Sequence, residues 1–246
     1  SGTVVYSQQE VTLTTYGGNG EGWRIVYSTA THQEIFDYII KGFNTAWKYR
    51  FPTFILGDGY QAKMREPLEM YDPETRGIKM VDTYPFIGLN GSIAKAEREP
   101  QHLCNIYSLE EELYEVVLKN SAEYESIAPE VVEYEERQCE DAEIIILSHG
   151  VVSRAADDAV KALRAQGIKA GYFRPITLRP YPEKQLRAAI AQSGAKKLLI
   201  AESAYGQFYR LTRQEIYGET VKMETLFMPG VGIIDYDIIS KVKSIL

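Results

Sequence analysis

From Ala142 to the C terminus, apolar and polar residues alternate in a regular order. Four short apolar runs are each followed by a stretch of helical period, and the runs are EIIILSHG, KAGYFRP, KKLLIAES and VKMETLF. This pattern predicts four strand–helix units. One face of the first helix is apolar throughout, with Ala155, Ala156, Ala159, Val160 and Leu163. Because strands that alternate with helices build mostly parallel sheets, we expect residues 137–246 to form an α/β domain.

The N-terminal third contains one more unit of this kind. RIVYSTA and TFILGDG predict two strands, with a helix from His32 to Lys48 between them. Thr31 and Glu34 fit a capping box at the start of this helix. The helix carries an apolar stripe that we expect to pack on the sheet, formed by Ile35, Phe36, Ile39, Ile40, Phe43 and Trp47. Since two strands and one helix do not make a complete domain, we expect an upstream segment or another polypeptide to complete residues 1–66.

Residues 67–136 separate these two domains. The first part, to about residue 107, is rich in Pro, Gly and charged residues and has no sustained periodicity, which is typical of a linker. Residues 108–136 predict a helical arm that leads into the C-terminal domain through the acidic run VVEYEER. We therefore expect a linker followed by a connecting helix.

Composition narrows the classes of function. The chain has 246 residues, of which 45% are hydrophobic, so two ordinary cores fit. A net charge of −7 argues against nucleic acid as a partner. Cys104 and Cys139 are too few and too far apart for a disulfide framework, a zinc site or an iron–sulfur cluster. No apolar run approaches the length that crosses a membrane, and the first residues do not resemble a signal peptide, so we expect a cytoplasmic protein.

Gly57-Asp58-Gly59 directly follows a predicted strand, and Asn90 lies downstream. Carboxylate and amide oxygens are proper ligands for Mg²⁺, and thiamine diphosphate enzymes use such a pair to hold the metal and the diphosphate. The residues after Gly59 do not predict the helix whose N terminus would face a diphosphate. A turn that ends the strand is therefore favoured over a cofactor site.

The glycine-rich segment Tyr16–Gly22 has glycines that let backbone amides approach a phosphate or a flat ring. It precedes a strand, whereas a dinucleotide fingerprint follows one. A flexible or ligand-facing loop is favoured over a nucleotide site.

His149 and Glu202 end two predicted strands, where open α/β sheets present ligand-facing residues. Ser148-His149-Gly150 is not a nucleophile elbow, and roles for Ser148 and Ser153 in starting the next helix are favoured over catalysis. Glu202 has no paired carboxylate and is suited to capping a helix. We assign no catalytic residue and no metal ligand to this chain.

The segment Arg174–Pro182 contains three prolines, which fix an extended crossover between a strand and a helix. Rigid loops of this kind typically position an interface. We expect Arg174, Pro175, Thr177 and Pro180 to pack subunits together.

Five segments, in the same order along the chain, resemble the α subunits of the 2-oxoacid:ferredoxin oxidoreductases. They are YGGNGEG, GFNTAWKYRFPTFILGDGYQAKMREPLE, CEDAEIIILSHG, LRAQGIKAGYFRPITLRPYPEKQL and AESAYGQFYRLTRQEIYG. The family usually has His at the position of Asn19. The spacing of Gln61, Lys63 and Met64, together with CEDAE, is similar to that of the branched-chain (2-ketoisovalerate) members.

This resemblance implies a partial thiamine-diphosphate pyrimidine-type domain followed by a transketolase C-terminal-like domain. It implies thiamine diphosphate and Mg²⁺ at the interface with a partner β subunit, and iron–sulfur clusters only in partner γ and δ subunits. A 2-oxoacid would lose CO₂, ferredoxin would receive the electrons, and coenzyme A would take the acyl group. The resemblance also implies that the GDG sequence is not a metal site. It further implies that the complex is an oligomer and that the isolated chain is inactive.

The segment SGTVVYSQQE resembles the part of the family that follows a turn beside the substrate. The resemblance matches Gly2 to the glycine of that turn and Val5 to a position that reads the tail of the substrate. It also implies that Gln8 and Asn19 lie near the substrate or cofactor. An apolar Val5 suits a branched 2-oxoacid, and a buried turn is the alternative for this segment.

Two other classes of function remain open at this point. One is a transketolase-like or 2-oxoacid dehydrogenase β chain, and the other is a non-catalytic dimerisation module. Reduction of ferredoxin or a viologen by the complex distinguishes the oxidoreductase hypothesis from the transketolase-like or dehydrogenase alternative. Co-purification with a partner that carries a thiamine site and cysteine clusters tests the oxidoreductase hypothesis as a whole.

Overall fold

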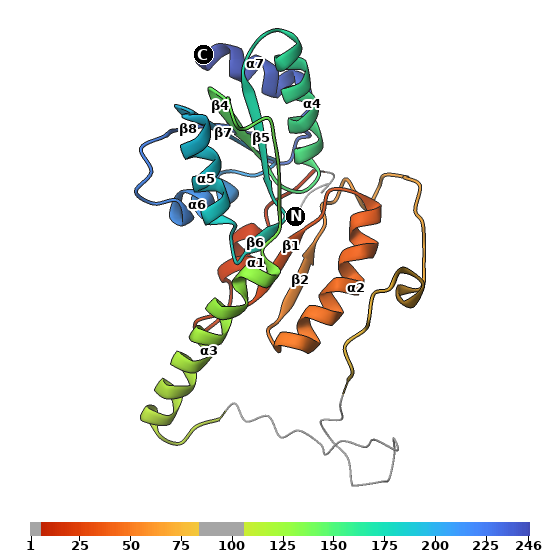
Figure 1. The fold of residues 1–246 in the computed structure, drawn as a ribbon, viewed down its shortest axis with the longest axis vertical. Helices are drawn as coiled ribbons and strands as arrows, with labels where there is room; N and C mark the ends of the chain where they lie inside the picture. Colours follow the sequence, from red (N-terminus) through yellow and green to blue (C-terminus); the bar gives the residue numbers. More distant parts are fainter. Residues whose placement is uncertain (1–5, 84–105) are drawn as a thin grey trace.

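The computed structural model describes residues 6–83 and 106–246. These residues build two sheets whose strand ends meet at a junction (Figure 1). The N-terminal sheet has the strand order β2-β1-β6, and the C-terminal sheet has the order β3-β5-β4-β7-β8. Gly2, Val5 and Asn90 lie outside the described residues.

The C-terminal sheet confirms the four predicted strands. They run parallel and are β4 (Ile144–Leu147), β5 (Ala170–Pro175), β7 (Lys197–Glu202) and β8 (Lys222–Phe227). A fifth strand, β3 (Tyr134–Arg137), pairs antiparallel with β5 at one edge. The sequence predicted continuous helix to residue 136, which is wrong, because the helix ends at Val131 and the acidic run that follows is extended.

Helices cover both faces of this sheet, which explains why its central strands are apolar at every position. Helices α4 (Val152–Ala165) and α7 (Asp235–Ile245) pack on one face against Ile144 and Ile146. Helices α5 (Glu183–Ser193) and α6 (Gln207–Glu215) pack on the other face against Ile145 and Leu147. Burying each such side chain contributes about 1.5–3 kcal/mol.

The N-terminal sheet has three strands among the described residues, one more than the sequence predicted. The parallel strands β1 (Ile25–Ser28) and β2 (Thr53–Leu56) are joined by β6 (Thr177–Arg179), which pairs antiparallel with β1. Strand β6 comes from the proline-rich crossover, whose extended backbone is already suited to sheet pairing. The C-terminal half of the chain therefore supplies part of the N-terminal sheet.

Helix α2 (His32–Tyr49) forms as predicted, but the expectation that its whole apolar stripe packs on the sheet is wrong. Gly42 and Thr45 are its buried positions, and Gly42 lets the helix approach Ile55 of β2 closely. Ile39 and Phe43 are 45% and 62% exposed. Small residues of the helix therefore meet the sheet, because a Cβ atom at Gly42 would lie only 3.0 Å from Ile55.

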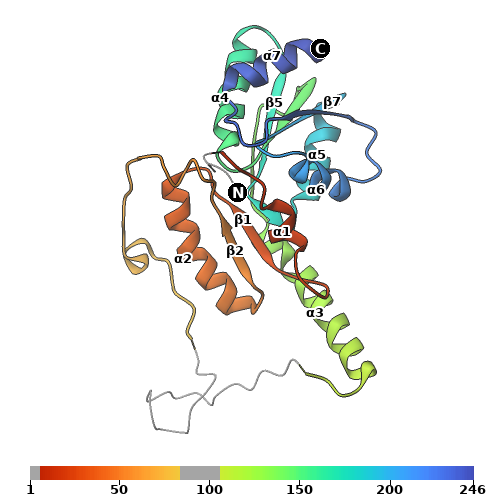
Figure 2. The ribbon, with the colours of Figure 1, turned by 180° about the vertical axis from the view of Figure 1, so that it is seen from behind.

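The linker runs along α2 in its described part. It contains the 3₁₀ helix η1 (Pro73–Arg76), and the Tyr71 hydroxyl donates a hydrogen bond to Asp37 at 2.7 Å. Helix α3 (Glu110–Val131) extends away from the two sheets, and only its C-terminal part contacts them (Figure 2). A short helix, α1 (Val11–Tyr16), lies beside β1 and α6. None of the helices in the described ranges is long and apolar enough to cross a membrane.

Candidate functional site

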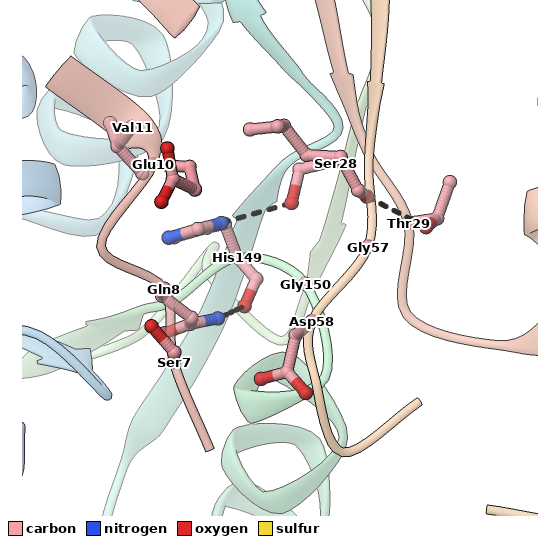
Figure 3. Close-up of a pocket in the computed structure, with 11 residues that line it drawn as sticks. Ser7, Gln8, Glu10, Val11, Ser28, Thr29, Gly57, Asp58, His149 and Gly150 are labelled. Carbon is pink, nitrogen blue, oxygen red and sulfur yellow. Dashed lines mark hydrogen bonds between the residues drawn. The ribbon is translucent and has the colours of Figure 1, made fainter. Parts of the chain in front are cut away.

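The carboxyl ends of strands from both sheets meet at one junction (Figure 3). Ser28 ends β1 and Thr29 follows it, Gly57 and Asp58 follow β2, and His149 lies just after β4. A cavity of about 20 Å³ lies between these strand ends. This volume accommodates one water molecule and no organic ligand. In open α/β proteins this end of a sheet carries the ligand site, so both ligand-facing edges are closed against each other here.

Gln8 joins the N-terminal segment to the C-terminal sheet. Its side-chain Nε2 donates to the carbonyl of His149 at 2.7 Å, and its Oε1 accepts from the backbone N–H of Ser203 at 2.9 Å. The Gln8 N–H also donates to the Ser203 carbonyl at 3.1 Å. Because both ends of the buried amide are used in this way, Gln8 acts here as an anchor between parts of the chain.

His149 is buried at the centre of the junction. Its Nδ1 lies 2.9 Å from the hydroxyl oxygen of Ser28, and its ring lies against Phe208. Burial, with a smaller contribution from the positive charge of Arg174, lowers the pKa of His149 to about 3. The imidazole is therefore neutral at physiological pH and holds β1 against the end of β4.

We expect the free energy of unfolding to fall between pH 6.5 and about 3 because of His149. In this range the unfolded chain binds a proton on His149 and the folded chain does not, so lowering the pH favours unfolding by about 1.4 kcal/mol per pH unit. Denaturant unfolding of the wild type and of His149→Gln across this range isolates the effect as the difference between the two pH slopes. Parallel slopes would show that His149 is not held neutral by the fold.

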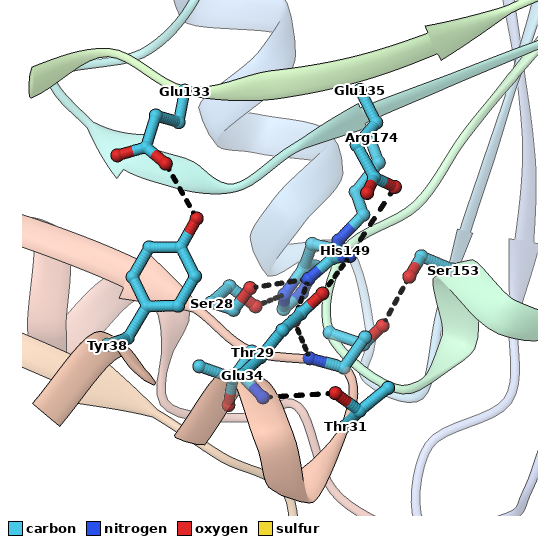
Figure 4. A network of polar contacts seen from close by, with 12 residues as sticks. Ser28, Thr29, Thr31, Glu34, Tyr38, Glu133, Glu135, His149, Ser153 and Arg174 are labelled. Carbon is cyan, nitrogen blue, oxygen red and sulfur yellow. Dashed lines mark hydrogen bonds and ion pairs between the residues drawn. The ribbon is translucent and has the colours of Figure 1, made fainter. Parts of the chain in front are cut away.

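Arg174 and Glu34 form the principal ionic contact of the junction (Figure 4). The guanidinium donates to the two carboxylate oxygens of Glu34 at 2.9 and 2.6 Å and to the Ser28 carbonyl at 3.1 Å. Burial alone would lower the pKa of Arg174, but the hydrogen bonds and charge of Glu34 raise it above its usual range. This bidentate pair links α2 to β5 and keeps Arg174 charged although its side chain is only 3% exposed.

Glu34 does not complete the predicted capping box. The Thr31 hydroxyl oxygen accepts from the Glu34 N–H at 3.1 Å, as expected for an N-cap. The Glu34 carboxylate, however, accepts from the Ala30 N–H at 2.6 Å and pairs with Arg174. The carboxylate is drawn to the stronger partner, a charged guanidinium, so only half of the box forms.

The residues predicted at a subunit interface lie in this junction within one chain. Arg174 and Thr177 are buried, and Thr177 accepts from the Glu133 N–H at 2.8 Å. Pro175 pairs with Tyr134 in the sheet. Pro180 is half-buried beside a groove between α3 and α6.

Asp58 closes a turn at the end of β2. One carboxylate oxygen accepts from the backbone N–H groups of Tyr60 and Gln61 at 2.6 and 3.3 Å. The Gln61 side chain in turn bonds the Asp58 N–H and the Thr29 carbonyl. Burial raises the pKa of the Asp58 carboxyl, and the hydrogen bonds from the backbone N–H groups of Tyr60 and Gln61 oppose this shift.

The glycine-rich segment folds around Arg24. The guanidinium donates to the carbonyls of Gly17 and Gly22 at 2.5 and 2.8 Å, and Asn19 is exposed. The loop therefore turns carbonyl oxygens toward the Arg24 guanidinium, whereas a phosphate-binding loop turns backbone N–H groups toward its ligand. The segment does not fit a nucleotide phosphate.

Glu202 and Ser153 have the local roles predicted for them. The buried Glu202 carboxylate accepts from the N–H groups of Gln207, Phe208 and Tyr209 at 3.0 Å each and so caps α6. The Ser153 hydroxyl donates to the Gly150 carbonyl at 2.6 Å in the first turn of α4.

The described residues do not fit a complete thiamine diphosphate and Mg²⁺ site. Asp58 uses one carboxylate oxygen in its own turn and is joined there by no other carboxylate from the described part of the chain, the glycine-rich segment presents carbonyls, and the junction cavity is far smaller than the cofactor. In the described ranges, no group of three or more His, Cys, Asp or Glu side chains gathers to hold a metal ion. We derive no reaction step through this cofactor on these residues.

Sequence reasoning missed Ser28 and Ser203 and treated Glu34 only as a cap. Ser28 and Ser203 carry one detectable signal, since each is a polar residue at the end of an apolar strand. Nothing local indicated that Glu34 would pair with Arg174, which lies 140 residues away in sequence.

Two protein-family models match the chain in sequence. Residues 4–134 match the domain described as "Pyruvate flavodoxin/ferredoxin oxidoreductase, thiamine diP-bdg". Residues 142–236 match "Pyruvate:ferredoxin oxidoreductase core domain II". The first match covers more than half of the chain, and the second covers most of the C-terminal sheet.

Curated relatives point in the same direction. The chain is 33% identical over 189 residues to ketoisovalerate oxidoreductase subunit VorB of Methanothermobacter marburgensis, covering 76% of this chain and 51% of the relative. It is 30% identical over 238 residues to 2-oxoglutarate synthase subunit KorA of Methanothermobacter thermautotrophicus, covering 84% and 60%. The chain therefore spans about half to three-fifths of the length of these relatives.

Solved structures show the same fold. A 2-oxoglutarate:ferredoxin oxidoreductase from Magnetococcus marinus aligns with a TM-score of 0.80 at 20% identity, over 98% of this chain and 45% of that one. A split-gene transketolase aligns with a TM-score of 0.51 at 17% identity, over 97% and 61%. The predicted α/β fold, with a thiamine diphosphate-type domain followed by a transketolase C-terminal-like domain, is confirmed.

Proposed function

Because the chain belongs to the 2-oxoacid:ferredoxin oxidoreductase family, we propose that it is the α subunit, or a large part of it, of a thiamine diphosphate-dependent enzyme of this kind. The enzyme would convert a 2-oxoacid to an acyl-coenzyme A and pass the electrons to ferredoxin. The observation that carries this proposal is the ordered match of both family domains along one chain.

The closed junction supports a shared cofactor site. Both sheets turn their ligand-facing edges toward each other, and Gln8, His149 and Arg174 fill the space between them. We propose that a partner β subunit holds the diphosphate and Mg²⁺, and that further γ and δ subunits carry the iron–sulfur clusters. This chain would supply a wall of the site, with Gly2, Val5, Gln8 and Asn19 as the proposed residues near substrate or cofactor. The isolated chain would be inactive.

We propose a branched-chain 2-oxoacid as the substrate. The relative with 33% identity is a ketoisovalerate oxidoreductase subunit, and the apolar Val5 suits an apolar substrate tail. The relative with 30% identity is a 2-oxoglutarate synthase subunit, whose substrate carries a second carboxylate. A site built for an apolar tail would reject that charge.

The test is the coenzyme A-dependent reduction of methyl viologen by the complex purified through a tag on this chain. We expect 3-methyl-2-oxobutanoate to give a kcat/KM at least about tenfold above those of 2-oxoglutarate and pyruvate. Turnover that favours 2-oxoglutarate would overturn the substrate assignment alone. A complex with a full set of subunits that reduces viologen with none of these acids would overturn the proposed activity.

A further inference from the structure

The C-terminal sheet has the strand order of a doubly wound fold with a topological switch point. Strand β4 lies at its centre, the chain passes from β4 to β5 on one side, and it continues from β7 to β8 on the other. Helix α4, which follows β4, and helix α6, which follows β7, lie on opposite faces of the sheet. Such an arrangement opens a crevice between the ends of β4 and β7, and this crevice is where folds of this class bind their ligands.

Here the crevice is occupied by residue 8 of the same chain. His149 follows β4 and Ser203 follows β7, and Gln8 bonds to the backbone of both. The contacts are 141 and 195 residues away in sequence. None of these contacts uses the side chain of His149 or Ser203, so the crevice recognises the side-chain amide of Gln8 through one carbonyl and one N–H.

These two backbone groups select a particular chemistry. A carbonyl and an N–H placed side by side are complementary to the NH₂ and the oxygen of one primary carboxamide. A carboxylate matches the N–H but would bring a buried charge against the His149 carbonyl. Gly150 keeps the space open, because a Cβ atom at this position would lie 3.1 Å from Nε2 of Gln8.

We propose that the crevice between β4 and β7 is a carboxamide-binding site that the chain fills in cis, with Tyr6–Gln9 acting as a tethered ligand. A side chain of the same molecule occupies the position where an ordinary doubly wound sheet binds its ligand. This explains why the C-terminal domain has a complete ligand-binding topology and no chemistry of its own. Carboxamide binding at this crevice is independent of the proposed enzymatic function.

Chemical rescue of Gln8→Gly tests the proposal on the full chain. This substitution removes a side chain whose atoms correspond to propionamide, so propionamide is the matched probe and propionate is its charged control. We expect Gln8→Gly to lower the melting temperature by roughly 4 °C or more, because two buried backbone groups lose their partners. Propionamide at about 0.1 M should restore about half of that loss, and propionate should restore none. The wild type, whose crevice is filled, should respond to neither.

The hydrogen-exchange rate of the Ser203 N–H distinguishes loss of this particular contact from a general packing defect. The Ser203 N–H should exchange faster in Gln8→Gly than in the wild type, and propionamide should slow it again while leaving the N–H groups of α7 unchanged. If Gln8→Gly does not fold, Gln8→Ala takes its place in the same exchange measurement, with acetamide as the matched probe and acetate as its charged control. Equal effects of propionamide and propionate, or no effect of propionamide on Ser203 exchange, would overturn the proposal.

Discussion

Replacing Arg174 by methionine is expected to remove roughly 3 kcal/mol from the free energy of unfolding. Methionine keeps most of the volume but leaves Glu34 without its bidentate partner and the Ser28 carbonyl without a donor. The cost arises because the partly buried Glu34 carboxylate and the Ser28 carbonyl lose the charged group that satisfied both. Urea unfolding followed by circular dichroism measures the change.

Arg76→Met is the matched control for this prediction. Arg76 contacts Glu69 at 2.6 Å, but both side chains are largely exposed, so its removal should change the stability by a small fraction of the Arg174 effect. A double variant, Arg174→Met with Glu34→Gln, should be less destabilised than the sum of the two single variants. Additive single effects, or equal effects of Arg174→Met and Arg76→Met, would contradict the role assigned to the pair.

Replacing Gly150 by alanine is expected to destabilise the chain by a similar amount, roughly 3 kcal/mol. Gly150 has a φ of 54°, and a Cβ atom there would lie 3.1 Å from the Gln8 amide and 3.2 Å from the Ser28 hydroxyl. The variant therefore combines backbone strain with displacement of two side chains that hold the junction together. Thermal unfolding and the exchange of the Ser203 N–H both report it.

Gly194→Ala separates strain from displacement. Gly194 has a φ of 67°, and a Cβ atom there would meet no other atom within 4 Å, so alanine costs only the strain of the left-handed backbone, about 1 kcal/mol. The difference between the two variants measures the contribution of the junction. If both substitutions cost the same, the close approach at Gly150 contributes nothing to stability.

The C-terminal domain was predictable because its signals are local. Strands buried on both faces are apolar at every position, and amphipathic helices repeat every three to four residues, so a short window contains the whole pattern. Ala156, Ala159, Val160 and Leu163 of α4 are buried as their spacing indicated. The caps formed by Ser153 and Glu202 also depend on neighbours only a few residues away.

The junction was not predictable because its partners are far apart in sequence. The third strand of the N-terminal sheet comes from Thr177–Arg179, roughly 150 residues after the strand that it joins. The prolines near it indicated an extended backbone but not which strand it would meet. The packing of α2 was mispredicted for a related reason. The helix contacts the sheet through Gly42, where a larger side chain would not fit, and Phe43 of the apolar stripe is left exposed.

We propose that this chain contributes to a shared thiamine diphosphate site and does not form one alone. Isothermal titration of thiamine diphosphate with Mg²⁺ tests it, with the 246-residue chain alone and with the complex that contains its partner subunits. We predict no saturable heat with the isolated chain and stoichiometric binding with the complex. Saturable one-to-one binding to the isolated chain, with a dissociation constant near or below about 10 μM, would show that the chain forms a cofactor site alone.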